Sequence, residues 1–366
     1  MTASKHRMGR SCGGGRRLSA RAVACAVLAA LALAACSGGQ PASNSRASAT
    51  HRASVPAKVG HPAKPCSAAV ARASSGRWKA LAPAPLSRTE VAAAVVGDAV
   101  YVVGGFDART AASTRKVERV DLCTGRWSLV HPISAALNHM GVASYGGSLY
   151  VLGGYLPRTD TNSEATARFW RYEPHTDRWS AMPSAPTPRA AFAIAVLGHR
   201  LYAAGGRNDS VLALRTVDVF DFARHRWSRA PSLEVGREHV AGMAAAGAVY
   251  VLGGRVAGVN LAAVERYVPG GDRWQELPPL PLARSGFGAA ATPGRITVVG
   301  GEGPAGTIRE VDALDLASGA WRRLAPMGTP RHGLGVVSIG SVILAIEGGP
   351  TPGLSYSRTV QRLLIR

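Results

Sequence analysis

One short pattern recurs six times along this chain of 366 residues. A pair of glycines follows apolar or β-branched residues in YVVGG, YVLGG, YAAGG, a second YVLGG, TVVGG and AIEGG. Counted between first glycines, the copies lie 49, 52, 48, 47 and 48 residues apart. A regular period of about 50 residues indicates one supersecondary unit repeated along the chain. The first glycines are Gly104, Gly153, Gly205, Gly253, Gly300 and Gly348.

A second mark keeps nearly the same spacing. Tryptophans recur at intervals of 49, 52, 48, 47 and 47 residues. Several are preceded by runs in which every second residue is apolar, such as KVERVDL, TVDVFDF, AVERYVP and EVDALDL. This alternation is typical of a half-buried strand. The tryptophans are Trp78, Trp127, Trp179, Trp227, Trp274 and Trp321.

Together the two marks resemble the kelch repeat over residues 78–366. That resemblance implies an all-β fold, a six-bladed kelch-type β-propeller with four strands in each blade. The innermost strands are expected at the small apolar runs 91–96, 191–196, 242–247 and 286–291. The second strand should end at the diglycine, the third is the alternating run, and the tryptophan should open the fourth and pack between blades.

The two ends of the repeat array predict how the ring closes. After the last diglycine, TVQRLLI (359–365) reads as a third strand with no tryptophan behind it. At the other end, WKALAPAP (78–85) reads as a fourth strand with nothing before it. We therefore expect the N-terminal strand to complete the C-terminal blade, which removes a free sheet edge.

Residues 1–35 have the features of an export signal. They contain six cations and no acid, followed by 14 apolar residues at 22–35. That length suits a signal peptide better than a membrane span. The ending Leu-Ala-Ala-Cys36 resembles a bacterial lipoprotein signal, which implies lipid on the thiol of Cys36. Arg16-Arg17 leaves twin-arginine export open beside the general secretory route.

Residues 36–77 should then form a basic tether. They are rich in Ser, Ala and Pro, with no acidic residue, so we expect them to be disordered. With export, Cys66 and Cys123 are expected to form a disulfide across the ring closure, the alternative being two free thiols. The domains predicted are therefore 1–35 signal, 36–77 lipidated cysteine and tether, and 78–366 propeller.

The charge fits the same location. The chain has 43 basic and 22 acidic residues, a formal net charge of +21. Twelve of the cations precede Trp78. A basic excess can indicate nucleic-acid binding, but outside the cytoplasm we expect no nucleic acid. The basic excess could instead attract anionic lipid heads or cell-wall polymers. The alternative is that the cations only keep the tether solvated.

One face of the propeller should collect two sets of loops, those before the innermost strands and those after the diglycines. Partners usually dock on this face in the family that the chain resembles. An arginine recurs at five of the strand entrances, and this recurrence favours a structural role. Residues that differ between units are better site candidates. For partner or ligand binding these are Phe106, Tyr155, Arg207, Arg255, Glu302 and His332.

Catalysis is the competing hypothesis. Exported sugar mutarotases resemble this architecture, and such chemistry needs an acid and a base near the axis. Glu90, His139, Glu238 and His239 could supply them, though no motif selects the pair or the sugar. Sequence spacing predicts no metal site and no cofactor. The copper oxidases of the galactose oxidase type carry seven kelch blades, a different number.

These observations predict a lipid-anchored, monomeric propeller on the extracytoplasmic face of a bacterial membrane. It should bind a protein or glycan partner through its loop face without catalysis. The alternative is an exported sugar mutarotase or isomerase that uses the acidic and histidine residues near the axis.

Overall fold

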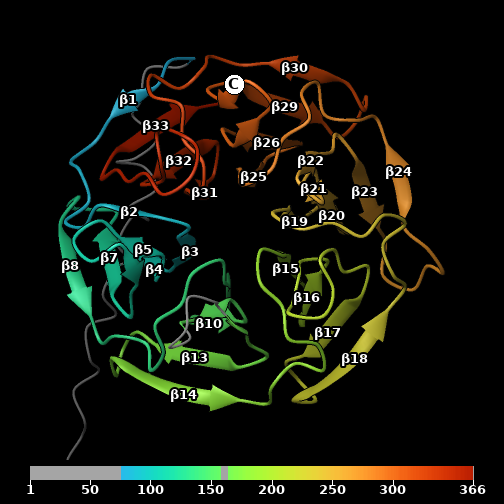
Figure 1. The fold of residues 1–366 in the computed structure, drawn as a ribbon, viewed down its shortest axis with the longest axis horizontal. Helices are drawn as coiled ribbons and strands as arrows, with labels where there is room; N and C mark the ends of the chain where they lie inside the picture. Colours follow the sequence, from blue (N-terminus) through green and yellow to red (C-terminus); the bar gives the residue numbers. More distant parts are fainter. Residues whose placement is uncertain (1–75, 158–163, 366) are drawn as a thin grey trace, which may run out of the picture. The chain divides into compact units, whose positions relative to one another are not determined.

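The computed structural model describes residues 76–157 and 164–365, all of which belong to one unit, His61–Arg366. In this part of the chain the structure contains six four-stranded antiparallel sheets arranged about a common centre (Figure 1). The innermost strands of neighbouring sheets contact one another all the way round, and the last contacts the first. The expected all-β propeller is confirmed.

The first three blades follow the chain from inside to outside. Blade 1 consists of β3 (Ala92–Val96), β4 (Ala99–Val103), β7 (Val117–Asp121) and β8 (Trp127–Val130). Blade 2 consists of β9 (Gly141–Tyr145), β10 (Ser148–Leu152), β13 (Phe169–Glu173) and β14 (Arg178–Met182). Blade 3 consists of β15 (Ala193–Leu197), β16 (Arg200–Ala204), β17 (Val217–Asp221) and β18 (Arg226–Ala230).

The remaining blades repeat the order, except at the closure. Blade 4 consists of β19 (Ala241–Ala245), β20 (Ala248–Leu252), β23 (Val264–Tyr267) and β24 (Gln275–Leu277). Blade 5 consists of β25 (Gly288–Thr292), β26 (Arg295–Val299), β29 (Val311–Asp315) and β30 (Trp321–Arg323). Blade 6 consists of β31 (Gly335–Ile339), β32 (Val342–Ile346), β33 (Val360–Leu364) and β1 (Lys79–Ala80).

Short strands lie in the loops between blades or between second and third strands. They are β2 (Arg88–Thr89), β5 (Phe106–Asp107), β6 (Ala112–Ser113), β11 (Tyr155–Leu156), β12 (Glu164–Ala165), β21 (Arg255–Val256), β22 (Val259–Asn260), β27 (Glu302–Gly303) and β28 (Gly306–Thr307). No helix among the described residues is long and apolar enough to cross a membrane.

The predicted closure is confirmed by the pairing of β1 with β33. Lys79 lies opposite Arg362 and Ala80 opposite Gln361, and Figure 1 shows the two ends of the propeller side by side. The ladder is shorter than the predicted strand 78–85. Prolines at 83 and 85 have no backbone N–H to donate, which limits regular pairing there.

Tryptophans join neighbouring blades, as predicted. In five of the six repeat tryptophans, the indole Nε1 donates a hydrogen bond of 2.7–3.0 Å to a backbone carbonyl near the outer strand of the preceding blade. The bond at the closure runs from Trp78 to the carbonyl of Ala325, 247 residues away. The other four pairs are Trp179 with His131, Trp227 with Pro183, Trp274 with Pro231, and Trp321 with Pro278.

The arginine that recurs at the strand entrances is structural, as expected. All five copies are completely buried. Four bind an acid that is the second residue of the third strand of the same blade, and the fifth, Arg331, binds the amide oxygen of Gln361 at 2.9 Å. Burying a charge is costly unless it is paired, so each acid accompanies its arginine. The acidic pairs are Arg88–Glu118, Arg189–Asp218, Arg237–Glu265 and Arg284–Asp312.

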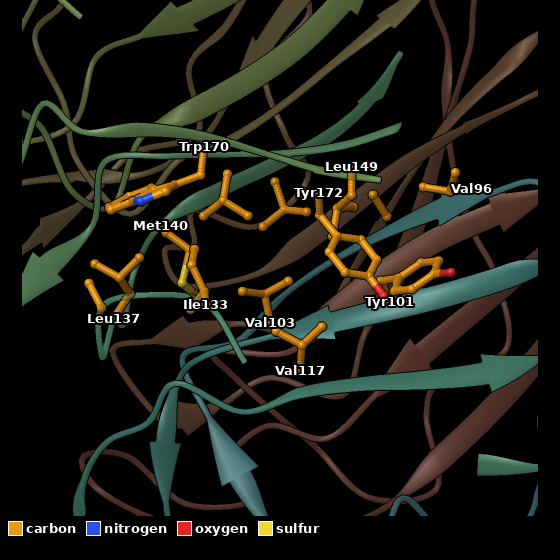
Figure 2. Packing of buried hydrophobic residues seen from close by; sticks show 14 of the residues in the cluster. Val96, Tyr101, Val103, Val117, Ile133, Leu137, Met140, Leu149, Trp170 and Tyr172 are labelled. Atoms are coloured by element: carbon orange, nitrogen blue, oxygen red, sulfur yellow. The ribbon is translucent and has the colours of Figure 1, made fainter. Parts of the chain in front are cut away.

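Blade 2 replaces both members of this pair at once. Leu137 occupies the arginine position, and Trp170 occupies the acid position in β13. Both belong to one apolar cluster with Met140 and Ile133 (Figure 2). The blade therefore fills the same space without charge, which removes the need for a buried ion pair.

The last diglycine aligns one residue differently from the prediction. In every blade the amide of the second residue of the pair donates to the carbonyl at the next blade's arginine position, and Gly348 makes this bond to Arg88. Glu347, with φ of 56°, therefore occupies the first glycine position, and Gly348 the second. The period of the last unit becomes 47 residues, equal to the tryptophan spacing.

Glu347 adds a second carboxylate at the seam between blades 6 and 1. It is completely buried and accepts hydrogen bonds of 3.0 and 3.2 Å from Arg88, which also binds Glu118. Burial raises the pKa of Glu347 well above its usual range, opposed by Arg88 and reinforced by Glu118. Arg88 therefore contacts two carboxyl groups at this seam.

Candidate functional site

The two predicted sets of loops meet at one end of the blades. The residue three positions before the start of each inner strand pairs through its backbone with the residue that follows the diglycine. These pairs are Thr89–Phe106, Asn138–Tyr155, Ala190–Arg207, Glu238–Arg255, Ser285–Glu302 and His332–Gly349. In the last pair the partner is Gly349, because Glu347 shifts the alignment by one residue.

A belt of backbone hydrogen bonds surrounds the axis just inside these pairs. Five of the six belt amides donate to the carbonyl at the equivalent position of the preceding blade, over 2.7–3.4 Å, and the amide of Val91 closes the circle on Gly333. The belt residues all have φ between 53° and 59°. They are Glu90, His139, Ala191, His239, Gly286 and Gly333.

The belt explains two differences from the sequence prediction. The left-handed residue turns the chain before the inner strand, so β3, β15 and β25 begin one or two residues later than predicted. In addition, the candidate acids and histidines come from two levels. Glu90, His139 and His239 lie in the belt, whereas Glu238 and His332 lie one position earlier, in the paired layer.

Three belt side chains from blades 1, 2 and 4 converge. His139 Nε2 lies 3.0 Å from His239 Nε2 and 3.1 Å from Glu90 Oε2. The two imidazole centroids are 4.8 Å apart. All three side chains are largely buried, with 10–13% of their area exposed. Residues 100 positions apart in sequence therefore form one central cluster.

Each histidine of this cluster is held from behind by an acceptor. His139 Nδ1 lies 2.5 Å from Asn138 Oδ1, and the amide of Asn138 donates to Ser113 Oγ at 2.7 Å. His239 Nδ1 makes a short contact with Glu238 Oε2. The acceptors behind the rings favour the tautomer with the proton on Nδ1 and the Nε2 lone pair toward the axis.

Arg255 connects the cluster to neighbouring acids. It donates to Glu238 Oε1 at 2.7 Å and to Glu302 Oε2 at 3.4 Å. Its Nη2 lies 3.3 and 3.2 Å from the two ring nitrogens of His239. These nearly equal distances place the guanidinium over the face of the imidazole, away from its in-plane lone pair.

His332 bridges two of the carboxylates on the other side of the cluster. Its Nδ1 lies 3.3 Å from Glu90 Oε1 and 3.5 Å from Glu302 Oε1. Its Nε2 lies 3.0 Å from the carbonyl of Thr351. Burial alone would lower the pKa of His332, but Glu90, Glu302 and that carbonyl raise it.

The members of the cluster differ in their ionisation at neutral pH. Burial opposes ionisation of Glu90, yet His139, His332 and His239 hold its pKa well below the usual range. Burial lowers the pKa of His139 to about 4, against the attraction of Glu90 and with the help of His239. At neutral pH Glu90 is ionised and His139 is neutral.

Glu238 is also ionised. Burial would raise its pKa, but the hydrogen bond from His239 and the contact with Arg255 lower it to about 2. Two carboxylate–histidine pairs, Glu90 with His139 and Glu238 with His239, therefore lie beside each other at the axis. The predicted catalytic candidates are brought together, as an acid–base site would require.

An aromatic rim lies beside these groups. The rings of Phe106 and Tyr155 approach His139 edge-on, with centroid distances of 6.3 and 5.6 Å. Burial raises the pKa of Tyr155 to about 12, although Arg207 lowers it. Arg207 is half-buried, and the hydrogen bonds described above involve Arg255 instead of Arg207. Arg207 joins this face through its backbone pair with Ala190.

The cavity over the cluster is small, about 100 Å³. Its lining combines the three converging side chains with small and apolar belt neighbours such as Phe192, Phe287 and Leu334. Pockets that enclose a drug-sized ligand are typically about 300–1,000 Å³. This one admits an ion, a few water molecules or one protruding group of a larger partner.

Sequence reasoning missed three polar residues that shape the molecule. Asn138 orients His139, while Glu118 and Glu347 share Arg88 at the seam. The mismatch between the last glycine interval and the last tryptophan interval was the available signal for Glu347. Two predicted sites, Cys36 and Cys66, lie outside the described residues, so the lipidation and the Cys66–Cys123 disulfide stay predictions.

Comparisons with known proteins agree with the repeat pattern. The family profile described as the KLHDC2/KLHL20/DRC7 Kelch-repeats domain matches residues 68–254. The Kelch motif profile matches residues 237–281 and 283–328. The two profiles together span most of the propeller.

Individual relatives show the same relationship over shorter stretches. Kelch-like protein terF of Aspergillus terreus is 31% identical over 196 residues, which cover 49% of this chain and 43% of that protein. Kelch-like protein 34 of Homo sapiens is 32% identical over 97 residues, covering 26% and 15%. The chain thus matches less than half the length of these relatives.

Among solved structures, that of YjhT superposes with a TM-score of 0.68. The two sequences are 18% identical, and the match covers 76% of this chain and 95% of the other. At this identity the likeness concerns the fold alone.

Proposed function

This chain belongs to the kelch-repeat family, and from that premise we propose that its propeller is an interaction module that binds a protein or glycan partner through the loop face. Kelch repeats support an interaction propeller in general. The partner's chemistry and the cellular location are inferred from the residues of this chain.

The observation that carries the proposal is the clustering of non-repeated polar side chains at one end of the axis. The same ring positions hold Ala191, Gly286 and Gly333 in the other blades, so the ring itself needs no polar group there. Three carboxylates, three imidazoles and Arg255 offer donors and acceptors in a fixed arrangement. Rigid scaffolds commonly present binding groups on such loops.

The rim determines the kind of partner. Phe106 and Tyr155 are half-buried and present ring edges beside the polar cluster. Aromatic surface next to oriented hydrogen-bonding groups suits a sugar ring or a polar peptide segment. Because the central cavity is only about 100 Å³, most of such a partner would lie across the rim.

We place this module outside the cytoplasm, anchored by lipid on Cys36. The support is the cationic start, the 14-residue apolar segment and the cysteine after Leu-Ala-Ala. Metabolic labelling with a palmitate analogue should mark the wild-type chain in membrane fractions. Cys36→Ser should lose the label and Cys12→Ser should keep it, whereas labelling of Cys36→Ser would refute the anchor.

A second candidate function is acid–base catalysis on a sugar. The two adjacent carboxylate–histidine pairs favour it, since strongly perturbed pKa values such as those of Glu90, His139 and Glu238 cluster at catalytic centres. The size of the cavity limits this function to a reacting group that enters from the rim. Anomer exchange of sugars, followed by NMR, would support it if Glu90→Gln and His239→Gln each abolished the activity.

Binding is tested with the full chain immobilised and exposed to envelope extracts and to a glycan array. Arg255→Ala combined with Tyr155→Ala should lose the captured partner. Arg178→Ala with Arg226→Ala is the matched control, because these exposed arginines lie at the third-to-fourth strand turns on the opposite face. Equal capture by all variants would remove the loop face as the binding surface.

A further inference from the structure

The central cluster has the donor set of a metal site. We propose that Glu90, His139 and His239 bind a divalent transition-metal ion of the zinc type at the end of the propeller axis. Sequence spacing predicts no metal ligands here, because the two histidines are 100 residues apart. Only the ring of blades brings them together.

The first argument is chemical. Both Nδ1 atoms face acceptors, which favours the tautomer in which each Nε2 presents its lone pair. Glu90 adds a carboxylate oxygen, which carries no proton of its own when ionised. Three lone-pair atoms therefore meet with no hydrogen-bond donor among them, and a positive species between them removes their repulsion.

The second argument is geometric. Ligand atoms about 2.1 Å from a tetrahedral zinc ion lie about 3.4 Å from one another. The two Nε2 atoms are 3.0 Å apart, and His139 Nε2 is 3.1 Å from Glu90 Oε2. All three donor atoms lie within 4.8 Å of each other. Small side-chain rotations would therefore bring all three to coordination distance.

The third argument concerns the groups behind the ligands. Metal-binding histidines usually donate their second ring N–H to a carboxylate or carbonyl, which fixes the tautomer. Glu238 is the acceptor at Nδ1 of His239, and the side-chain carbonyl of Asn138 is the acceptor at Nδ1 of His139. Asn138 is itself fixed by Ser113. The two rings are therefore oriented before any ion arrives.

The fourth argument is the backbone. Glu90, His139 and His239 have φ of 53° or 54°, in the left-handed region that is unfavourable for a non-glycine residue. Glycine occupies the equivalent position in blades 5 and 6. Retention of strained ligand-type side chains in three blades fits a site whose function requires them.

Charge and access also suit a divalent cation. The groups around the axis include three acidic side chains, Glu90, Glu238 and Glu302, beside Arg255 and His332, and acidic surroundings favour a dication. Arg255 covers the face of His239 and leaves the axial side free. The ligands remain 10–13% exposed beneath the 100 Å³ cavity, which leaves a coordination position open to water or a partner's oxygen.

The test uses the full chain after removal of bound metal with EDTA. Zn²⁺ is titrated by calorimetry, and Co²⁺ is added to record its visible spectrum, which reports coordination geometry. We expect about one Zn²⁺ in this site, together with a Zn²⁺-dependent rise in the thermal midpoint.

Two sets of variants separate this site from cysteines and histidines elsewhere in the chain. His139→Gln with His239→Gln should weaken Zn²⁺ binding by at least about 10-fold and abolish the thermal shift. Glu90→Gln keeps the size of the side chain and should weaken binding similarly, even if the double variant folds poorly. The matched control is His175→Gln with His199→Gln, whose side chains are 77% and 50% exposed.

The control should bind as the wild type does. Three results would overturn the proposal: no Zn²⁺ binding by the wild type, undiminished binding by the ligand variants, or equal loss in the control. The first would mean that a shared proton, and not a metal ion, lies between the three donor atoms.

Discussion

Replacing Arg189 by leucine tests the role of the buried arginines most directly. Arg189 and Asp218 are both completely buried, and Nη2 lies 2.7 Å from Asp218 Oδ2. Arg189 Nη1 also donates to the carbonyls of Gly205 and Thr216 at 2.8 and 3.1 Å. The substitution leaves Asp218 without its main partner in the interior.

Removing one partner of a buried ion pair costs about 3–5 kcal/mol, because the remaining charge is uncompensated. Replacing both partners by apolar residues is often neutral or stabilising. The protein already uses that solution in blade 2, where Leu137 and Trp170 occupy the two positions. We therefore expect Arg189→Leu with Asp218→Leu to recover at least about 2 kcal/mol relative to Arg189→Leu.

The measurement is equilibrium unfolding in guanidinium chloride, followed by tryptophan fluorescence and circular dichroism. Coincident transitions would justify a double-mutant cycle. Arg229→Ala is the control, since this arginine is 64% exposed and lies 3.6 Å from Asp218, and it should cost less than about 1 kcal/mol. A double variant no more stable than Arg189→Leu would refute the reasoning.

Three further predictions concern the seam, the diglycines and the cysteines. Because burial raises the pKa of Glu347 above its ordinary 4.5, the contribution of this residue to stability should fall as pH rises from 4.5 toward neutral, while only the unfolded state ionises; His139, whose pKa burial lowers to about 4, acts in the opposite direction over the same range, so the test compares urea midpoints of wild type and Glu347→Gln, whose difference should shift against the wild type as pH rises, and a constant difference would contradict it. Gly253→Ala should unfold at a lower temperature than Gly258→Ala: both have positive φ, but only at Gly253 would a Cβ lie 2.7 Å from a ring carbon, and equal melting temperatures would count against the packing argument. Peptide mapping of the unreduced protein should find Cys66 joined to Cys123, and alkylation of both thiols would disprove the pairing.

Much of the architecture could be predicted because it depends on local, repeated chemistry. Alternating runs and diglycines marked the strands, and the incomplete units at the two ends implied that β1 pairs with β33. The recurring arginine was correctly assigned to the scaffold, because a residue needed in five blades serves the blades. The predicted starts of the inner strands were less accurate. The alternation of apolar and polar residues does not reveal the left-handed residue that precedes each inner strand.

The sequence also separated the scaffold from the candidate site. Glu90, His139, Glu238 and His239 stood out because they broke the repeat, and they do lie together. The repeat pattern did not predict the layer along the axis in which each of these side chains lies. Whether a side chain enters the central cluster or the layer behind it depends on the backbone turn in the belt and on contacts between blades.

By itself, then, the amino-acid order determined the repeated unit, its strand order, the closure of the ring and the face on which the variable loops gather. Only the tertiary structure decided that Glu90, His139 and His239 converge and that Glu347 shares Arg88 with Glu118. The physical reason is that these contacts join different blades. Their distances depend on how the sheets pack around the axis, and neighbouring residues along the chain do not encode that packing locally.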